Sequence, residues 1–182
     1  AVDLATAGDT IVVRGGTYPL TTSIVINAAG TADAPIRIEP FVGEHPVFDA
    51  SANPRHDDPP EPRVDDSIAA TSDALGLLLT GNAEYWHIVG LEIAHAPYYG
   101  VRIYGSHNTL ERLVLHDHGA SGLEITGKEG FSPSGNLVLN SDSFRNFDPQ
   151  GDGEDADGFA AKFDTLAFAG DAPDLGAFES TP

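Results

Sequence analysis

A short pattern recurs along the chain, in which a glycine precedes alternating apolar and polar positions. Four segments carry it, and their starts fall 24, 22 and 36 residues apart. These starts are Gly76, Gly100, Gly122 and Gly158. A second set of alternating runs lies between them, at 86–93, 108–115 and 136–144. Alternation with a period of two is typical of strands, so each cycle predicts strand, turn, strand, turn.

Strands this short cannot bury an apolar face alone. Stacking each cycle on the next, at the ~4.8 Å spacing of neighbouring strands, buries continuous apolar columns. The expected inward columns are Leu77, Val101, Leu123 and Phe159, and Leu79, Ile103, Ile125 and Ala161. The repeat therefore predicts an all-β chain, a right-handed parallel β-helix (a solenoid) with rungs of about 22–24 residues.

The rest of the chain fits a single β-helix domain spanning 1–182. Runs at 8–18, 23–27, 35–40 and 46–49 are predicted to be its first strands. Residues 51–72 are rich in proline and aspartate and predict a long surface excursion. Residues 164–182 are expected to form a C-terminal tail. A β-sandwich also has many short strands, but its hairpin signals are missing and it would leave the repeat unexplained.

The chain is strongly acidic, with a formal net charge of −19, and Lys128 and Lys162 are its only lysines. Such a charge repels nucleic acid and anionic membranes and favours divalent cations. No apolar run of about 18 residues occurs, so no membrane insertion is expected. The first residues lack a basic start and a hydrophobic stretch, so no signal peptide is expected within this chain. Cysteine is absent, so disulfides are excluded.

Two stretches resemble a known family. Residues 8–18 and 34–38 look like the opening rungs of β-helical polysaccharide lyases. Asn-Ser-Asp-Ser-Phe-Arg-Asn-Phe-Asp-Pro at 140–149 and Ala-Asp-Gly-Phe-Ala-Ala-Lys at 156–162 are similar to the pectate lyases of the ninth polysaccharide lyase family. The resemblance implies that Asp157 ligates a catalytic calcium. The family's other calcium ligands, in a segment resembling Ser-Asp-Asp-Gly-Trp-Asp, and its base lysine are not found in this sequence.

The chemistry that the resemblance implies is β-elimination. It removes the proton on C5 of a uronic acid, and calcium bound to the neighbouring carboxylate stabilises the resulting charge. Carboxylates are dense at 148–157, and Asp142 lies one rung position earlier. We therefore expect a calcium site that includes Asp157, Asp155 and Asp142. A solvated acidic loop is the alternative, and the catalytic residues stay unassigned.

Substrate contacts are expected on the outward side of the strands. By alternation Lys162 points outward, where it would meet a sugar carboxylate or, alternatively, form a structural ion pair. Arg102 is also expected to stand outward, beside exposed aromatic rings at Tyr104 and 98–99. Sugars stack on such rings and carboxylates pair with arginine. Simple packing of the turn is the alternative.

The histidines offer a different site. His116 and His118 flank Asp117, and His95 and His107 are expected at other turns. Zinc needs a third ligand close in space, and no HExxH pattern occurs. Turn histidines bonded to the backbone are therefore the favoured interpretation.

Two functions follow from these patterns. The first is a polysaccharide lyase-like protein that acts on or binds an acidic polysaccharide such as pectate, with calcium as cofactor. The alternative is a non-catalytic β-helix that serves as a carbohydrate-binding or structural surface module. For either function we expect a monomer that is secreted or held at the cell surface.

Overall fold

The computed structural model describes residues 1–54, 74–127, 132–147 and 158–162, with the backbone alone at 160–162. Its strands form three parallel sheets, which we call A, B and C. Sheet A contains β1 (Thr10–Val13), β4 (Ile36–Pro40), β7 (Trp86–Val89), β10 (Thr109–Glu111) and β13 (Leu137–Leu139). Sheet B contains β2 (Gly16–Pro19), β5 (Pro46–Asp49), β8 (Glu92–Ala94), β11 (Val114–His116) and β14 (Asp142–Phe144). Sheet C contains β3 (Ile24–Ile26), β6 (Leu77–Leu79), β9 (Val101–Ile103), β12 (Leu123–Thr126) and β15 (Phe159–Lys162).

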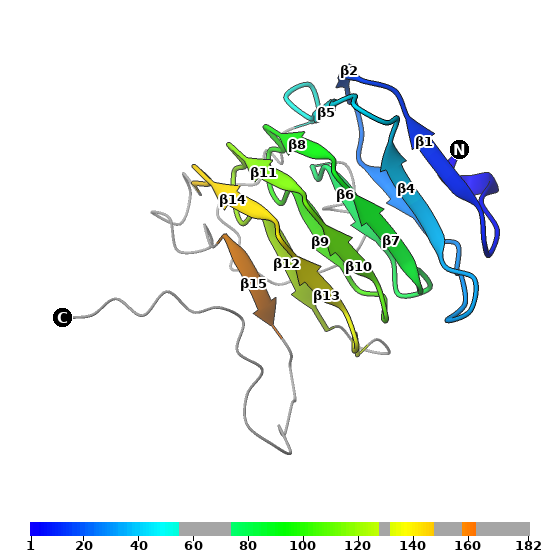
Figure 1. Ribbon diagram of the computed structural model, residues 1–182. Helices are drawn as coiled ribbons and strands as arrows, with labels where there is room; N and C mark the ends of the chain where they lie inside the picture. Colours follow the sequence, from blue (N-terminus) through cyan, green and yellow to red (C-terminus); the bar gives the residue numbers. More distant parts are fainter. Residues whose placement is uncertain (55–73, 128–131, 148–157, 163–182) are drawn as a thin grey trace.

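The chain visits the three sheets in turn, so one strand from each makes one rung. Figure 1 shows the rungs stacked from the blue β1 towards the yellow β14 and the orange β15. Every strand pairs in parallel with the strand one rung away. A short 3-10 helix, Val2–Leu4, packs beside the first rung, because its Val2 contacts the core. The predicted parallel β-helix is therefore confirmed.

Each rung holds three strands, so the prediction of two strands in each cycle is wrong. The runs at 86–93, 108–115 and 136–144 each bend in the middle. The bends are made by Gly90, Arg112 and Asn140, which all have left-handed backbone, with φ between 49° and 63°. A single left-handed residue redirects the strand at a sharp corner, and period-two alternation does not reveal it.

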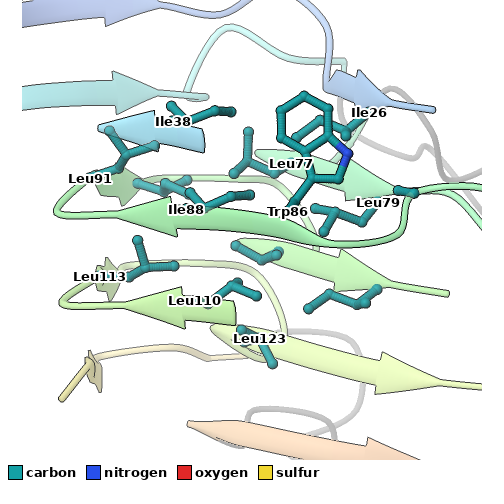
Figure 2. Packing of buried hydrophobic residues seen from close by; sticks show 14 of the residues in the cluster. Ile26, Ile38, Leu77, Leu79, Trp86, Ile88, Leu91, Leu110, Leu113 and Leu123 are labelled. Atoms are coloured by element: carbon teal, nitrogen blue, oxygen red, sulfur yellow. The ribbon is translucent and has the colours of Figure 1, made fainter. Parts of the chain in front are cut away.

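The core is a set of apolar columns inside the coil. The register aligns Leu77, Val101, Leu123 and Phe159, and also Leu79, Ile103, Ile125 and Ala161. Both predicted columns are therefore confirmed in register. Figure 2 shows how the inward side chains of neighbouring rungs pack on one another, with Trp86 beside Ile26 and Leu79. The Trp86 indole also donates a 2.7 Å hydrogen bond to the Ala28 carbonyl, which satisfies its buried N–H.

Glycines before the sheet C strands allow rungs to approach closely. A Cβ at Gly100 would lie 2.5 Å from the Gly122 carbonyl oxygen and would also collide with the His118 ring. At Gly158 the nearest atom among the described residues would be 3.6 Å away, on Ser143, which is an ordinary contact. The same position in the repeat is thus tight inside the stack and open at its last described rung.

The predicted excursion begins and ends at one place on the coil. Asn53 donates a 2.7 Å hydrogen bond to the Leu75 carbonyl, and the Leu75 N–H donates to Ser23 Oγ. Most of the excursion, the tail at 164–182 and the acidic stretch at 148–157 lie outside the described residues, so the single-domain boundaries stay a prediction. In the described part of the chain, no helix has the length and apolar character needed to cross a membrane.

Candidate functional site

The structure describes one of the three predicted calcium ligands, Asp142. Asp142 begins β14 in sheet B, is exposed, and pairs in register with Val114. It shares an outward column with Glu92, two rungs away. Asp155 and Asp157 lie outside the described residues, just before β15. The grouping of these three carboxylates around calcium therefore stays a prediction.

Lys162 closes β15 and pairs in register with Thr126 of β12. β15 belongs to sheet C whereas Asp142 belongs to sheet B, so the two residues lie on different sheets of the last described rung. Contact of Lys162 with a sugar carboxylate stays a prediction.

The expected exposure of Arg102 and Tyr104 is wrong, because they are only 3% and 2% exposed. The two residues do lie together, as predicted, with the guanidinium 5.2 Å from the Tyr104 ring centre and 5.0 Å from that of Tyr99. Arg102 points away from the coil interior, but it enters a second buried cluster that includes Leu75 and Leu78. Alternation gives a side chain's direction relative to its own sheet and does not report what else packs on that side.

This second cluster contains a buried ion pair. Arg102 Nε lies 2.8 Å from Glu124 Oε2, and Glu124 is its register neighbour on β12. Burial, together with the Glu124 charge, raises the pKa of Tyr99 far above its usual value, so its phenol is neutral. The contacts that Arg102 makes are those of a buried ion pair between rungs.

The histidines divide into two kinds. His118 is buried, and its Nδ1 accepts a 3.1 Å hydrogen bond from the Ala96 N–H, as predicted for a turn histidine. His116 instead ends β11 and contacts the carboxylates of Glu92 and Asp117. Within the described ranges, no group of three or more His, Asp or Glu residues is arranged to hold a metal ion.

Sequence reasoning missed a network of charged residues on the outward side of sheet B. It joins consecutive rungs: Asp49 contacts His95, Glu92 contacts both His45 and His116, and Asp117 contacts both His116 and Arg145. The corner residues His95, Asp117 and Arg145 all have left-handed backbone and stack one above another. We call the chain of contacts from Glu92 through His116 and Asp117 to Arg145 the sheet B latch. The sequence signal that could have revealed this network is the repeat, because it places residues that are 22 or 28 positions apart side by side.

The comparisons with known proteins agree with the geometry. Residues 1–170 match a family described as "Pel9A-like, right handed beta helix region". Pectate lyase PEL9 of Emericella nidulans is 38% identical over 162 residues, which cover 89% of this chain and 37% of that protein. Pectate lyase L of Dickeya chrysanthemi is 34% identical over 168 residues, which cover 89% of this chain and 35% of that protein.

Solved structures show the same fold. The crystal structure of pectate lyase Pel9A superposes with a TM-score of 0.69 at 30% identity, over 89% of this chain and 39% of that one. A rhamnogalacturonan lyase shares the fold alone, with a TM-score of 0.53 at 17% identity. This chain spans 37% of the length of PEL9 and 35% of that of the Dickeya chrysanthemi enzyme. The chain belongs to the Pel9A-like family of right-handed β-helices.

Proposed function

We propose that this chain acts on or binds an acidic, uronic acid polysaccharide such as pectate, by calcium-assisted β-elimination. The observation that carries the proposal is the family match over residues 1–170, joined to relatives whose names are pectate lyases. The Pel9A crystal structure supports it, because the β-helix superposes over 89% of this chain. A polysaccharide does not cross a membrane, so we propose that the protein is secreted or held at the cell surface, where it can meet the polymer.

Carboxylates would hold the calcium. Asp157, Asp155 and Asp142 offer only oxygen ligands, which is the donor set that calcium prefers. Asp142 fits such a role because it is exposed at the start of β14 and directed away from the coil interior. Bound calcium would supply a Lewis acid that stabilises charge on the substrate carboxylate. Lys162, four residues after Gly158 on β15, is proposed to bind a sugar carboxylate.

Calorimetry with calcium tests the metal site. We expect saturable binding to the 182-residue chain, weakened by about tenfold or more in Asp157→Ala because a charged ligand is lost. Asp33→Ala is the matched control, because it removes the same charge from an exposed turn at the other end of the stack. Equal, salt-sensitive uptake by all three proteins would indicate a bare acidic surface and would reject the site.

The enzymatic part of the proposal has its own test. Polygalacturonate is incubated with the chain and calcium, and ultraviolet absorbance follows the unsaturated products. We expect a calcium-dependent rise that Asp157→Ala abolishes. The base that removes the C5 proton must be neutral, so the assay covers about pH 7 to 10. If the absorbance does not rise at any pH in this range, catalysis by this chain is rejected.

The alternative is a non-catalytic carbohydrate-binding or structural module. Under this alternative, binding of the polymer is retained while no unsaturated product forms. Turnover that depends on Asp157 would contradict it.

A further inference from the structure

The inward column of sheet B changes character at its last described rung. Phe48, Ile93 and Leu115 occupy the column in three successive rungs, and all three belong to the apolar core. The next residue in register is Ser143 of β14, which is small and polar. Packing of the column alone favours another large apolar side chain, so the serine points to a role in hydrogen bonding.

The Ser143 hydroxyl lies beside the residue that precedes β15. A Cβ placed on Gly122 would be 2.0 Å from Ser143 Oγ and 3.0 Å from Asn146 Nδ2. The same Cβ would be 2.9 Å from the Gly158 carbonyl oxygen, so three polar atoms converge beside Gly122. Gly158 itself lies against Ser143, because a Cβ built on this glycine would be 3.6 Å from Ser143 Cβ and 3.7 Å from its Oγ.

The equivalent space is filled differently in the two rungs before. At Gly76 the Ile93 side chain fills it, with Cγ2 2.5 Å from the position of a Cβ. At Gly100 the ring of His118 fills it, with Nε2 at 2.3 Å. Along the stack the filling therefore changes from an apolar side chain to an imidazole, and then to a hydroxyl and an amide. The hydroxyl and the amide are the filling that lies beside Gly158.

Hydrogen bonds hold this polar filling in one arrangement. Asn146 Nδ2 donates to Ser143 Oγ at 2.9 Å, and Asn146 Oδ1 accepts the His118 N–H at 3.2 Å. Both ends of the Asn146 amide are thus used, which fixes its orientation. Gly158 is held by the preceding rung, because its carbonyl oxygen accepts the Leu123 N–H at 3.2 Å.

We propose that Ser143 and Asn146 form a polar seat that fixes the backbone at Gly158. The seat thereby positions Asp157, the residue before Gly158 in the chain, to ligate calcium. This inference rests on the proposed function, in which Asp157 is a calcium ligand. A ligand carboxylate is placed accurately when the backbone that carries it is held, and such outer contacts govern metal affinity. Ser143 and Asn146 are therefore positioning residues, which act through Asp157.

Calorimetry with calcium on the full chain tests the positioning. Ser143→Ala removes the hydroxyl, so we expect the calcium affinity to fall about tenfold. Ser143→Thr keeps the hydroxyl and should restore the wild-type affinity. A β-branched side chain fits this place in the column, because Ile93 occupies it two rungs earlier. Equal calcium affinity in the wild type and Ser143→Ala would overturn the proposal.

Amide hydrogen exchange, measured by NMR with calcium chelated, tests the seat without the metal. Ser143→Ala should speed exchange of the Leu123 amide about fivefold, the size expected when one neutral hydrogen bond is weakened. The Leu77 amide donates to the Gly100 carbonyl two rungs away and should exchange as in the wild type. An unchanged exchange rate at Leu123 in Ser143→Ala would overturn the seat.

Ser106→Ala is the matched control for both measurements. It also removes a serine hydroxyl, one that accepts the Ser134 N–H, and it should change neither the calcium affinity nor the Leu123 exchange rate. If Ser143→Ala does not fold, Ser143→Cys in reductant gives the same comparison, because its thiol has a similar shape and bonds weakly. A wild type that binds no calcium would reject the proposed function, and the positioning role with it. A wild type that binds calcium no better than Ser143→Ala would reject the positioning role alone.

Discussion

Arg102 of β9 and Glu124 of β12 form an ion pair that is buried on the outward side of sheet C. The Nε and Oε2 atoms are 2.8 Å apart, and the side chains are 4% and 2% exposed. The two residues are direct neighbours in register, so the pair joins adjacent rungs. Alternation directs Arg102 outward from sheet C, but the burial of this ion pair makes its guanidinium unavailable to a ligand.

Removing one partner of this pair should be costly. Glu124→Gln removes the carboxylate charge that lies 2.8 Å from the buried Arg102 guanidinium, and we expect it to lower the free energy of unfolding by about 3 kcal/mol. The measurement is urea unfolding at neutral pH. Glu39→Gln is the matched control, because it breaks the Arg37 pair, whose side chains are more than a third exposed, and should cost under about 1 kcal/mol. Equal losses in the two variants would show that the buried pair has no special role.

Asn108 should be essential to the corner that precedes sheet A. Its buried side chain accepts a hydrogen bond from the Trp86 N–H and donates one to the Ala83 carbonyl. Asn108→Ala leaves both backbone groups without partners, so we expect a loss of about 3 kcal/mol in the free energy of unfolding. Asn82→Ala, at an exposed turn, should cost about 0.5 kcal/mol. A loss as small as that control in Asn108→Ala would contradict the bonding.

Replacing a glycine that precedes a sheet C strand by alanine should have different effects at two positions of the repeat. Gly100→Ala forces its Cβ against the Gly122 carbonyl and the His118 ring. We expect a loss of about 2–3 kcal/mol, the usual cost of overpacking a rigid site. Within the described part of the chain, Gly158→Ala meets ordinary contacts alone, and it should cost less than about 1 kcal/mol. Thermal unfolding of both variants compares them directly, and similar midpoints would show that close approach at Gly100 is not limiting.

His118 should make the fold sensitive to acid. Burial lowers its folded-state pKa to about 3, below the unfolded value of 6.5. As the pH falls, the unfolded chain therefore takes up the proton before the folded chain does. The contribution of His118 to the free energy of unfolding is fully present above pH 6.5 and is lost as the pH drops towards 3. The contribution of this residue is roughly 4 kcal/mol.

A variant isolates that effect. Asn146 occupies the equivalent position one rung later, where its Oδ1 accepts the His118 N–H. His118→Asn thus keeps an acceptor for Ala96 and removes the titrating ring. We expect its stability to fall less between pH 6.5 and pH 3 than that of the wild type. The same acid dependence in both proteins would assign the effect to other groups.

Much of the fold could be predicted from the sequence because each inward column repeats. Leu77, Val101 and Leu123 follow a glycine at the same offset, so register could be obtained by counting residues. The third strand of each rung could not be obtained in this way. Its corner depends on left-handed backbone at residues such as Arg112 and Asn140, and most side chains at such corners carry no strong local signal.

The site was predictable only to a lesser extent. Burial of Arg102 depends on packing outside its own sheet, which periodicity does not describe. The sheet B latch depends on Glu92, His116 and Arg145, whose separations in sequence vary with the insertions in each rung. Their contacts follow from the register, and the register is known only when every insertion has been placed.

Binding of an oligogalacturonate in the presence and absence of calcium is the most direct measurement of the proposed function. Titration at about pH 8 should give saturable binding that chelation of calcium abolishes. Asp157→Ala should weaken the binding by about tenfold or more, through loss of a charged calcium ligand, and Asp33→Ala should not. Absence of binding with calcium present, binding that persists after calcium is chelated, or equal binding by wild type and Asp157→Ala with calcium present would contradict a calcium-dependent role on acidic polysaccharide.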